Sequence, residues 1–181
     1  MLPAGWVVLA VIAAVLLTIW VMSTLTRLDR LYARVAAARV ALDGQLVRRA
    51  VAVEALVASA GSALEPEFSR KCLHTVQRSL AAADLDRAPA ENALSRITAE
   101  LARRRPQFTL AAQDELDELV EAATRVAIAR RFYNGAVRDT RTLMGRKMPR
   151  LLHLTGKHEL PRYFDIEDDL NILPESEDTA A

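Results

Sequence analysis

Cysteine is almost absent from this chain, and its scarcity excludes several kinds of stabilising and reactive site. Cys72 is the only cysteine among 181 residues, so an intramolecular disulfide cannot form. A metal site built from several thiolates is excluded for the same reason. A lone cysteine is most often a small, half-buried side chain, and we expect that role for Cys72 rather than a redox one.

Aromatic residues and net charge are also scarce. Phe, Trp and Tyr together make up 5% of the chain, which disfavours a stacking platform for single-stranded nucleic acid. The 24 Lys and Arg side chains nearly balance 23 Asp and Glu, and the formal net charge is +1. The chain therefore lacks the strong positive field of a nucleic-acid-binding protein, and we expect no nucleic-acid partner.

The familiar catalytic and cofactor-binding motifs are missing too. The sequence contains no P-loop, no dinucleotide-binding glycine motif, no zinc-protease helix motif and no nucleophile elbow. The histidines His74, His153 and His158 have no second ligand at a metal-binding spacing, and the acidic residues near the end do not form a calcium loop. We therefore predict that the protein is not an enzyme, needs no cofactor and holds no metal.

Charged residues are absent from the first 26 positions, which are instead strongly apolar. A helix needs about 20 apolar residues to cross a bilayer core of roughly 30 Å, and this run is long enough. Trp6 and Trp20 lie near its two ends, where indole rings favour the membrane interfaces. The pattern predicts a transmembrane anchor at residues 1–26.

Two alternatives explain an N-terminal apolar run without an anchor. A cleaved signal peptide carries a basic start and a small-residue cleavage site, and neither is present here. A buried helix of a soluble core is the other alternative, but an uncharged run of this length argues against it.

Arginines follow the apolar run closely, whereas no Lys or Arg precedes it. Cations beside a span are retained in the cytoplasm, so we expect a single-pass protein of the cell membrane with its N-terminus outside and its C-terminal domain cytoplasmic. Arg27, Arg30 and Arg34 are then placed to meet lipid headgroups at the membrane interface.

Apolar residues after the span recur at steps of three and four, which is typical of amphipathic helices. The span is expected to continue directly into the first helix, which ends near Ser59. Three more helices are predicted at 66–85, 90–105 and 109–146. We therefore predict an all-α fold in which residues 27–164 form an antiparallel bundle of about four helices, followed by an acidic, disordered tail at 165–181.

Two blocks and an aromatic pair carry a family resemblance. The first block follows the span and comprises Leu31-Tyr32-Ala33-Arg34-Val35 and then Leu42-Asp43-Gly44-Gln45-Leu46-Val47-Arg48-Arg49. The second is Ala129-Arg130-Arg131-Phe132-Tyr133-Asn134-Gly135-Ala136-Val137, and the pair is Tyr163-Phe164. Their order and spacing resemble the LemA family of bacterial membrane proteins. The chain departs from the family in having no proline soon after Arg49 and in having Met148-Pro149 where the family has Phe-Pro. It therefore resembles a divergent member.

The resemblance implies a membrane anchor, a helical-bundle domain and no established catalytic activity. It also singles out a structural or interaction signature, which comprises Arg48, Arg49, Ala129, Arg130, Phe132, Tyr133 and Asn134. On a helix the small Ala129 can share a face with both aromatic rings. The rings are then core residues beside a polar seam, or they form a docking surface for a partner.

These observations predict an interaction or scaffold module at the membrane. Its expected partners are the lipid bilayer and either other proteins or further copies of itself. A regulatory or catalytic subunit of a membrane-bound enzyme, with a site that the sequence does not assign, is the alternative, and a self-assembling coat is a third possibility.

Overall fold

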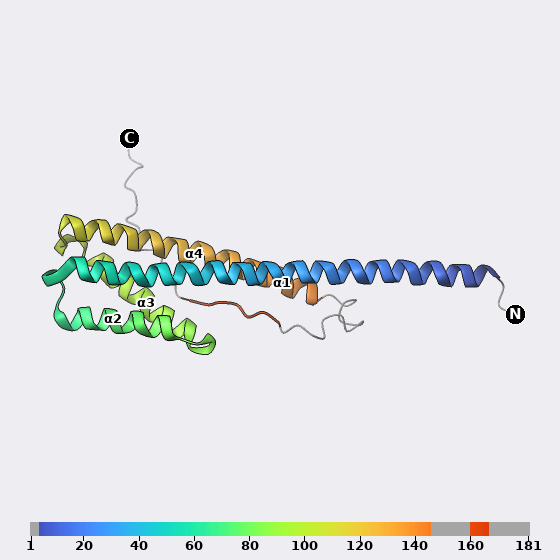
Figure 1. Cartoon of the computed structure of the whole chain (residues 1–181), viewed down its shortest axis with the longest axis horizontal. Helices are drawn as coiled ribbons and strands as arrows, with labels where there is room; N and C mark the ends of the chain where they lie inside the picture. Colours follow the sequence, from blue (N-terminus) through green and yellow to red (C-terminus); the bar gives the residue numbers. More distant parts are fainter. Residues whose placement is uncertain (1–3, 146–159, 167–181) are drawn as a thin grey trace, which may run out of the picture. The chain divides into compact units, whose positions relative to one another are not determined.

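The computed structural model describes residues 4–145 and 160–166, and the first of these ranges is almost entirely helical. The long elements are α1 (Ala4–Ala60), α2 (Pro66–Ala81), α3 (Asp84–Arg103) and α4 (Leu110–Met144), and the short 3-10 turns are η1 (Gly61–Ala63) and η2 (Arg105–Gln107) (Figure 1). No strand occurs in the described ranges. The prediction of an all-α chain with four helices is therefore confirmed there.

The first helix is a single element from Ala4 to Ala60, as predicted, and it passes through Gly44 without a break. One glycine inside a helix costs only about 1 kcal/mol relative to alanine. The helix gives way to a 3-10 turn at Gly61, whose φ of 49° lies in the left-handed region that favours glycine.

The third helix begins earlier than predicted. The break lies before Asp84, and Pro89, which was expected to lie in that break, is inside the helix. Pro89 lies in the second turn of α3. Its missing N–H therefore removes only one intrahelical hydrogen bond, close to the start of the helix. The Asp86 N–H donates to the Ala83 carbonyl at 2.9 Å, which closes the first turn before the proline.

The starts of α2 and α4 carry residues that favour the first turn of a helix. Pro66 occupies the first turn of α2, where a missing N–H costs nothing. The Thr109 hydroxyl accepts a hydrogen bond from the Ala112 N–H at 3.3 Å, so it caps the start of α4.

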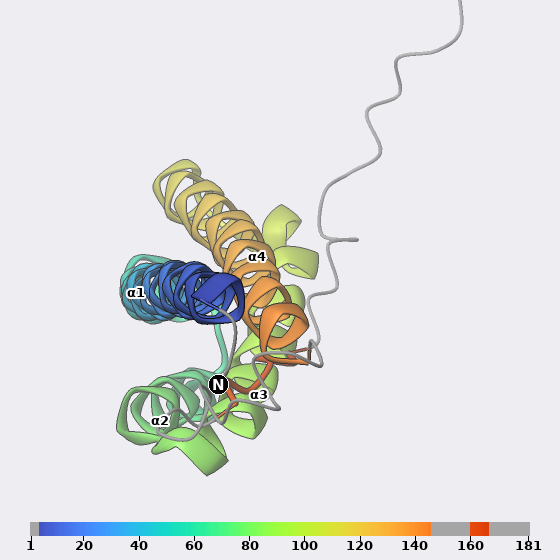
Figure 2. The same cartoon turned by 90° about the vertical axis from the view of Figure 1, so that its right-hand side faces the viewer.

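The chain forms two compact units. Unit 1 comprises Met1–Ala38 and Asn134–Tyr163, and unit 2 comprises Arg39–Tyr133 and Phe164–Ala181. In unit 2 all four long helices share one apolar core, and α2 and α3 lie side by side in both views (Figures 1 and 2). Leu56, Leu94 and Leu116 are each at most 1% exposed in that core. Burying one such side chain contributes about 1.5–3 kcal/mol.

Unit 1 has its own small cluster outside the span. Leu28 of α1 packs with Leu143 and Met144 of α4, and the Tyr32 hydroxyl lies 3.0 Å from the Met144 sulfur. Arg141 reaches the segment after α4, where its guanidinium carbon is 5.1 Å from the centre of the Tyr163 ring.

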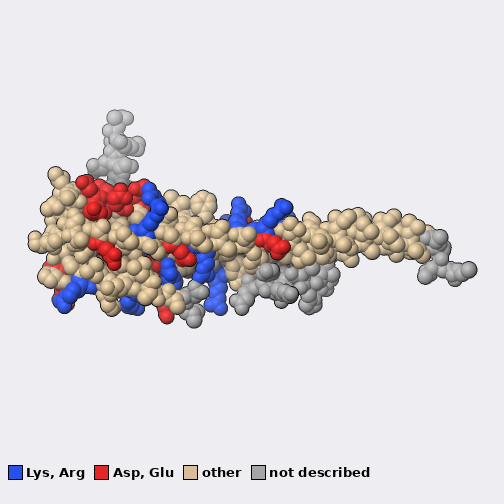
Figure 3. All heavy atoms as spheres, viewed as in Figure 1, with Lys and Arg blue, Asp and Glu red and all other residues tan. Residues whose placement is uncertain are grey.

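The N-terminal part of α1 is long and apolar enough to span a membrane. Its most apolar 18-residue window has a mean hydropathy of 2.5 and is 0% buried. The space-filling view shows this stretch without any Lys, Arg, Asp or Glu (Figure 3). Trp6 and Trp20 are 64% and 38% exposed on it.

Candidate functional site

A buried ion pair joins α1 to α3 in unit 2. The Arg49 guanidinium lies 2.7 Å from a carboxylate oxygen of Glu91, and the two side chains are 2% and 0% exposed. Arg49 also donates to the Ser95 hydroxyl at 2.9 Å. Removing two charges from water costs several kcal/mol per ion unless each is well paired, so this geometry has to be retained for the fold to hold.

Glu91 is the centre of that network. Its second oxygen accepts hydrogen bonds from the Ser79 hydroxyl at 2.8 Å and from the Arg87 Nε at 3.1 Å. Arg87 in turn lies 3.6 Å from Asp43, on α1. The carboxylate therefore connects α1, α2 and α3. Because Arg49, Ser79 and Glu91 at the centre of the network are buried, their role is to hold these helices together rather than to meet a substrate.

The two arginines of the first block have opposite surroundings. Arg49 is fully buried, whereas the adjacent Arg48 is exposed. Successive residues on a helix point about 100° apart, and at this position the rotation turns Arg49 toward the core and Arg48 toward solvent. The resemblance singled out both residues, but only Arg49 belongs to the buried network.

The aromatic residues of the second block are also separated. Tyr133 is 5% exposed and belongs to the core, whereas Phe132 is 72% exposed. The interpretation that both rings are core residues is therefore wrong for Phe132, whose ring lies outside the buried side of α4. Ala129 is half-buried.

The polar residues of that block face other parts of the chain. Arg130 donates a hydrogen bond to the Ile166 carbonyl oxygen at 2.7 Å, and the Ile166 side chain is 3% exposed. Asn134 is half-buried. Ordered packing thus extends to Ile166, two residues into the segment predicted as a disordered tail. The remainder of that tail, together with His153, His158 and Met148-Pro149, lies outside the described residues.

The arginines after the span remain at the surface. Arg27 and Arg30 are exposed, as a role at lipid headgroups requires. Arg34 is exposed too, and it lies 3.8 Å from Asp139 of α4. Its guanidinium therefore forms an ion pair within the protein and is also open to lipid headgroups.

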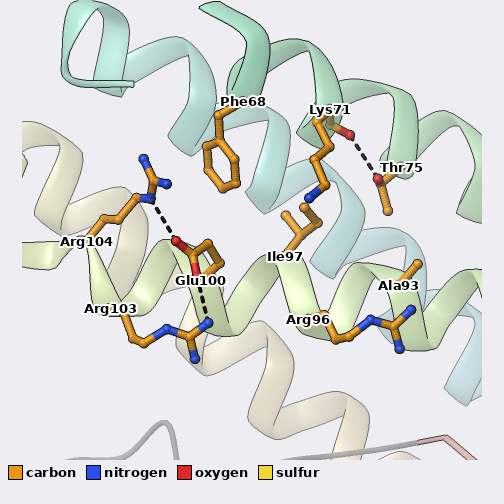
Figure 4. A pocket seen from close by; sticks show the side chains of 9 residues that line it. All are labelled: Phe68, Lys71, Thr75, Ala93, Arg96, Ile97, Glu100, Arg103 and Arg104. Carbon is orange, nitrogen blue, oxygen red and sulfur yellow. Dashed lines mark hydrogen bonds and ion pairs between the residues drawn. The ribbon is translucent and has the colours of Figure 1, made fainter. Parts of the chain in front are cut away.

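A groove of about 550 Å³ runs between α2 and α3 (Figure 4). It is lined by Phe68, Lys71 and Thr75 from α2, by Ala93, Arg96, Ile97, Glu100 and Arg103 from α3, and by Arg104 directly after α3. Four of these side chains are cationic and one is acidic. The groove is thus strongly positive, on a chain whose overall charge is almost balanced.

Glu100 offsets only one of the four positive charges of the groove, and it is already paired with two of the arginines. It accepts hydrogen bonds from Arg103 at 2.7 Å and from Arg104 at 3.1 Å, and these bonds lower the pKa of the Glu100 carboxyl. Arg104 also stacks over the Phe68 ring, with 4.2 Å between its guanidinium carbon and the ring centre. The hydrogen bonds and the ring contact hold the end of the groove in place.

Sequence reasoning missed this groove. The run Arg103-Arg104-Arg105 ends the helix at the surface, and the structure pairs each of these arginines with a carboxylate. Arg105 lies 2.5 Å from Asp117 of α4. The available signal was the spacing of Glu100 three and four residues before Arg103 and Arg104, which is the spacing of paired residues on a helix.

The described part of the chain contains neither a metal-binding cluster nor a reactive thiol. No cluster of three or more His, Cys, Asp or Glu side chains that suits a metal occurs there. Cys72 is fully buried, and burial raises the pKa of its thiol to about 11. The sulfur is therefore a protonated core group, which agrees with the structural role expected for it.

Comparisons with protein-family models, with curated proteins and with solved structures found no match. The LemA resemblance therefore stays a hypothesis that rests on the sequence blocks themselves.

Proposed function

We propose that this chain is a single-pass membrane protein whose helices form an antiparallel bundle that acts as an interaction module at the membrane surface. The observation that carries the proposal is the exposed apolar surface of the first part of α1. Val7, Leu9 and Leu16 are each more than half exposed, and the whole 18-residue window is unburied. A core helix of a soluble protein would bury these side chains, whereas a bilayer solvates them on every side.

The arrangement of charges supports the proposed orientation. Arg27 and Arg30 are exposed directly after the span, and no cation precedes it. This asymmetry favours a cytoplasmic helical domain and an external N-terminus. Membership of the LemA family, as a divergent member, is part of the same proposal and agrees with an anchor followed by helices.

The groove between α2 and α3 is the surface of the bundle that best suits a protein partner. Its lining of four cations and one already paired carboxylate attracts a segment rich in Asp or Glu. The Phe68 ring and Ile97 add apolar surface beside the charges. An acidic segment of a partner protein is therefore the proposed occupant.

Binding fits the groove better than catalysis. Its one carboxylate is held ionised by two arginines, and the Thr75 hydroxyl donates to the Lys71 carbonyl at 2.8 Å within its own helix. A general acid or base needs a pKa near neutrality, and a hydroxyl nucleophile needs an adjacent base. Neither requirement is met by these two side chains.

A binding experiment tests the groove. The full chain in detergent is titrated against a fluorescent hexaglutamate peptide, and binding is followed by anisotropy. We expect salt-sensitive binding that falls at least tenfold in the double variant Lys71→Glu, Arg96→Glu. The matched control is the double variant Arg70→Glu, Arg78→Glu, which reverses two exposed cations of α2 outside the groove and should weaken binding far less.

Equal losses for the groove variant and the control would reject the groove as the binding surface. The orientation is tested separately, with a C-terminal reporter that is active only outside the cytoplasm. We expect that reporter to be inactive, and an active one would overturn the proposed orientation.

A further inference from the structure

The face of α1 that points away from the core of unit 2 is apolar although it is exposed. Val40, Val47 and Val51 are 72%, 44% and 53% exposed, and Gly44 lies exposed between them. These four residues, which we call the outer face, recur at steps of four, three and four along the helix. That spacing places them on one side, opposite the buried Leu42, Leu46 and Val53.

No charged side chain lies on the outer face between Val40 and Val51, and the exposed Glu54, at the next position of the same spacing, ends this face. Asp43 and Arg48 lie on its two opposite edges, because each is rotated away from the centre of the face by the helical repeat. Ala41, Ala55 and Ala58 continue the small apolar surface beside it. An ordinary solvated helix face carries charged or polar residues, so an uncharged one with three exposed valines indicates a contact surface.

We propose that the outer face of α1 binds the same face of a second copy of this chain, with the two helices parallel. This inference rests on the proposed function, because an anchor in the same membrane brings two copies together in one orientation. Identical residues then meet across a two-fold axis, which is the geometry of a symmetric dimer.

The edge charges favour a parallel pair of helices over an antiparallel one. In a parallel pair, one edge of each helix lies beside the opposite edge of its partner, so Asp43 of one copy approaches Arg48 of the other. Their separation of five positions is that of the flanking charge pairs of parallel coiled coils. In an antiparallel pair the same edges meet, and like charges would approach each other.

Both edge residues are available for this pairing. The Asp43 side chain is 47% exposed even though it lies 3.6 Å from Arg87. Arg48 is exposed, and within the described residues it makes no ion pair. Two symmetric Asp43–Arg48 contacts would therefore flank the apolar contact.

The size of the residues suits close packing between helices. A methyl group built on Gly44 would have no atom within 4 Å, so the chain itself leaves the space beside this residue open. Small residues at a contact let two helix backbones approach closely. From Val40 to Val51 the surface is about 17 Å long, which is roughly one and a half heptads.

A contact of this length is short for a soluble coiled coil, which usually needs three or four heptads. Tethering to one membrane compensates for the shortness, because it raises the effective concentration of the second copy and fixes its direction. The pairing is therefore expected for the full chain in a membrane.

Disulfide trapping in membranes tests the proposal. Single cysteines are introduced into the full chain by Val47→Cys and Val51→Cys, and by the controls Ile128→Cys and Leu110→Cys. The control positions are 47% and 82% exposed on α4, so they are at least as accessible as Val47. The native Cys72 is buried, and the unmodified chain supplies the background.

We expect mild oxidation to trap at least five times more dimer at the two α1 positions than at the two α4 positions. Adding Arg48→Asp to the Val47→Cys chain should lower the yield severalfold, because Asp43 of one copy would then face an aspartate. Gly44→Leu should lower it too, while the helical circular dichroism signal of the monomer is retained.

The pairing would be overturned if the dimer yields at Val47 and Val51 were no higher than those at Ile128 and Leu110. The same result is expected if a different partner covers the face. The membrane pellet is assayed in the same samples. Failed trapping with the protein still in the pellet rejects only the pairing, whereas loss of the protein from the pellet rejects the membrane anchor itself.

Discussion

Arg49 of α1 and Glu91 of α3 lie 2.7 Å apart, with side chains that are 2% and 0% exposed. The pair is separated by 42 residues in the sequence, and it fixes where the third helix packs on the first. Ser79 and Arg87 occupy the other oxygen of Glu91, so the carboxylate is surrounded by donors. A buried charge held in this way is tolerated only while every partner is present.

Removing one partner of this pair should destabilise the protein strongly. Glu91→Leu leaves the Arg49 guanidinium buried without its carboxylate, and we expect a loss of about 3–5 kcal/mol in the free energy of unfolding. The double variant Arg49→Met, Glu91→Leu removes both charges and should recover most of that loss. Denaturant unfolding of the full chain in detergent, followed by circular dichroism, measures both.

Arg48→Met is the matched control for this pair. It makes the same change one residue earlier, at an exposed position, and should alter the free energy of unfolding by less than about 0.5 kcal/mol. A loss for Arg48→Met as large as that for Arg49→Met would contradict the separation of the two arginines.

The two neighbouring aromatic residues of α4 should respond differently to truncation. Tyr133→Ala removes a ring that is 5% exposed, and we expect it to cost about 3–5 kcal/mol. Phe132→Ala removes a ring that is 72% exposed and should cost less than about 0.5 kcal/mol. Thermal melts of both variants decide the matter, and equal shifts would show that Phe132 is buried in solution.

The Glu100 carboxylate should contribute stability at neutral but not at low pH. Hydrogen bonds from Arg103, and then from Arg104, lower its pKa in the folded chain. Its contribution is therefore complete above the ordinary glutamate pKa of about 4.3 and is lost as the pH falls through the lowered value. Glu100→Gln should melt earlier than the unmodified chain at about pH 7 but not at about pH 2. An equal difference at both pH values would argue against the ion pairs.

Cys72 should react with thiol reagents only after unfolding. Its side chain is fully buried, and the raised pKa of about 11 keeps the thiol protonated at neutral pH. We expect labelling by a maleimide to be slow in the folded chain and rapid in denaturant. Rapid labelling without denaturant would indicate an exposed thiolate and would reopen a redox role for this residue.

Apolar periodicity predicted most of the fold. The spacing of apolar side chains in α1 and the capping hydroxyl of Thr109 placed two helix limits within one residue of those observed. Pro89 misled the prediction of α3, because a proline in the second turn costs one hydrogen bond while the surrounding contacts, including those of Glu91, keep the helix intact.

The sites were harder to predict because they depend on contacts between helices. No local pattern reveals that Glu91 meets Arg49, since the two residues come together only when α3 packs on α1. The groove has the same origin, because Lys71 and Phe68 belong to α2 and Arg96 and Glu100 belong to α3. The outer face of α1 is visible in the sequence as an uncharged helix side from Val40 to Val51.

The central claim is that the first part of α1 lies in a bilayer, and alkaline extraction of membranes tests it most directly. Membranes that carry the full chain are washed at high pH, which releases peripheral proteins, and the protein is then followed by flotation in a density gradient. The account predicts that the chain floats with the lipid after the wash. Recovery of the chain in the aqueous supernatant would contradict it.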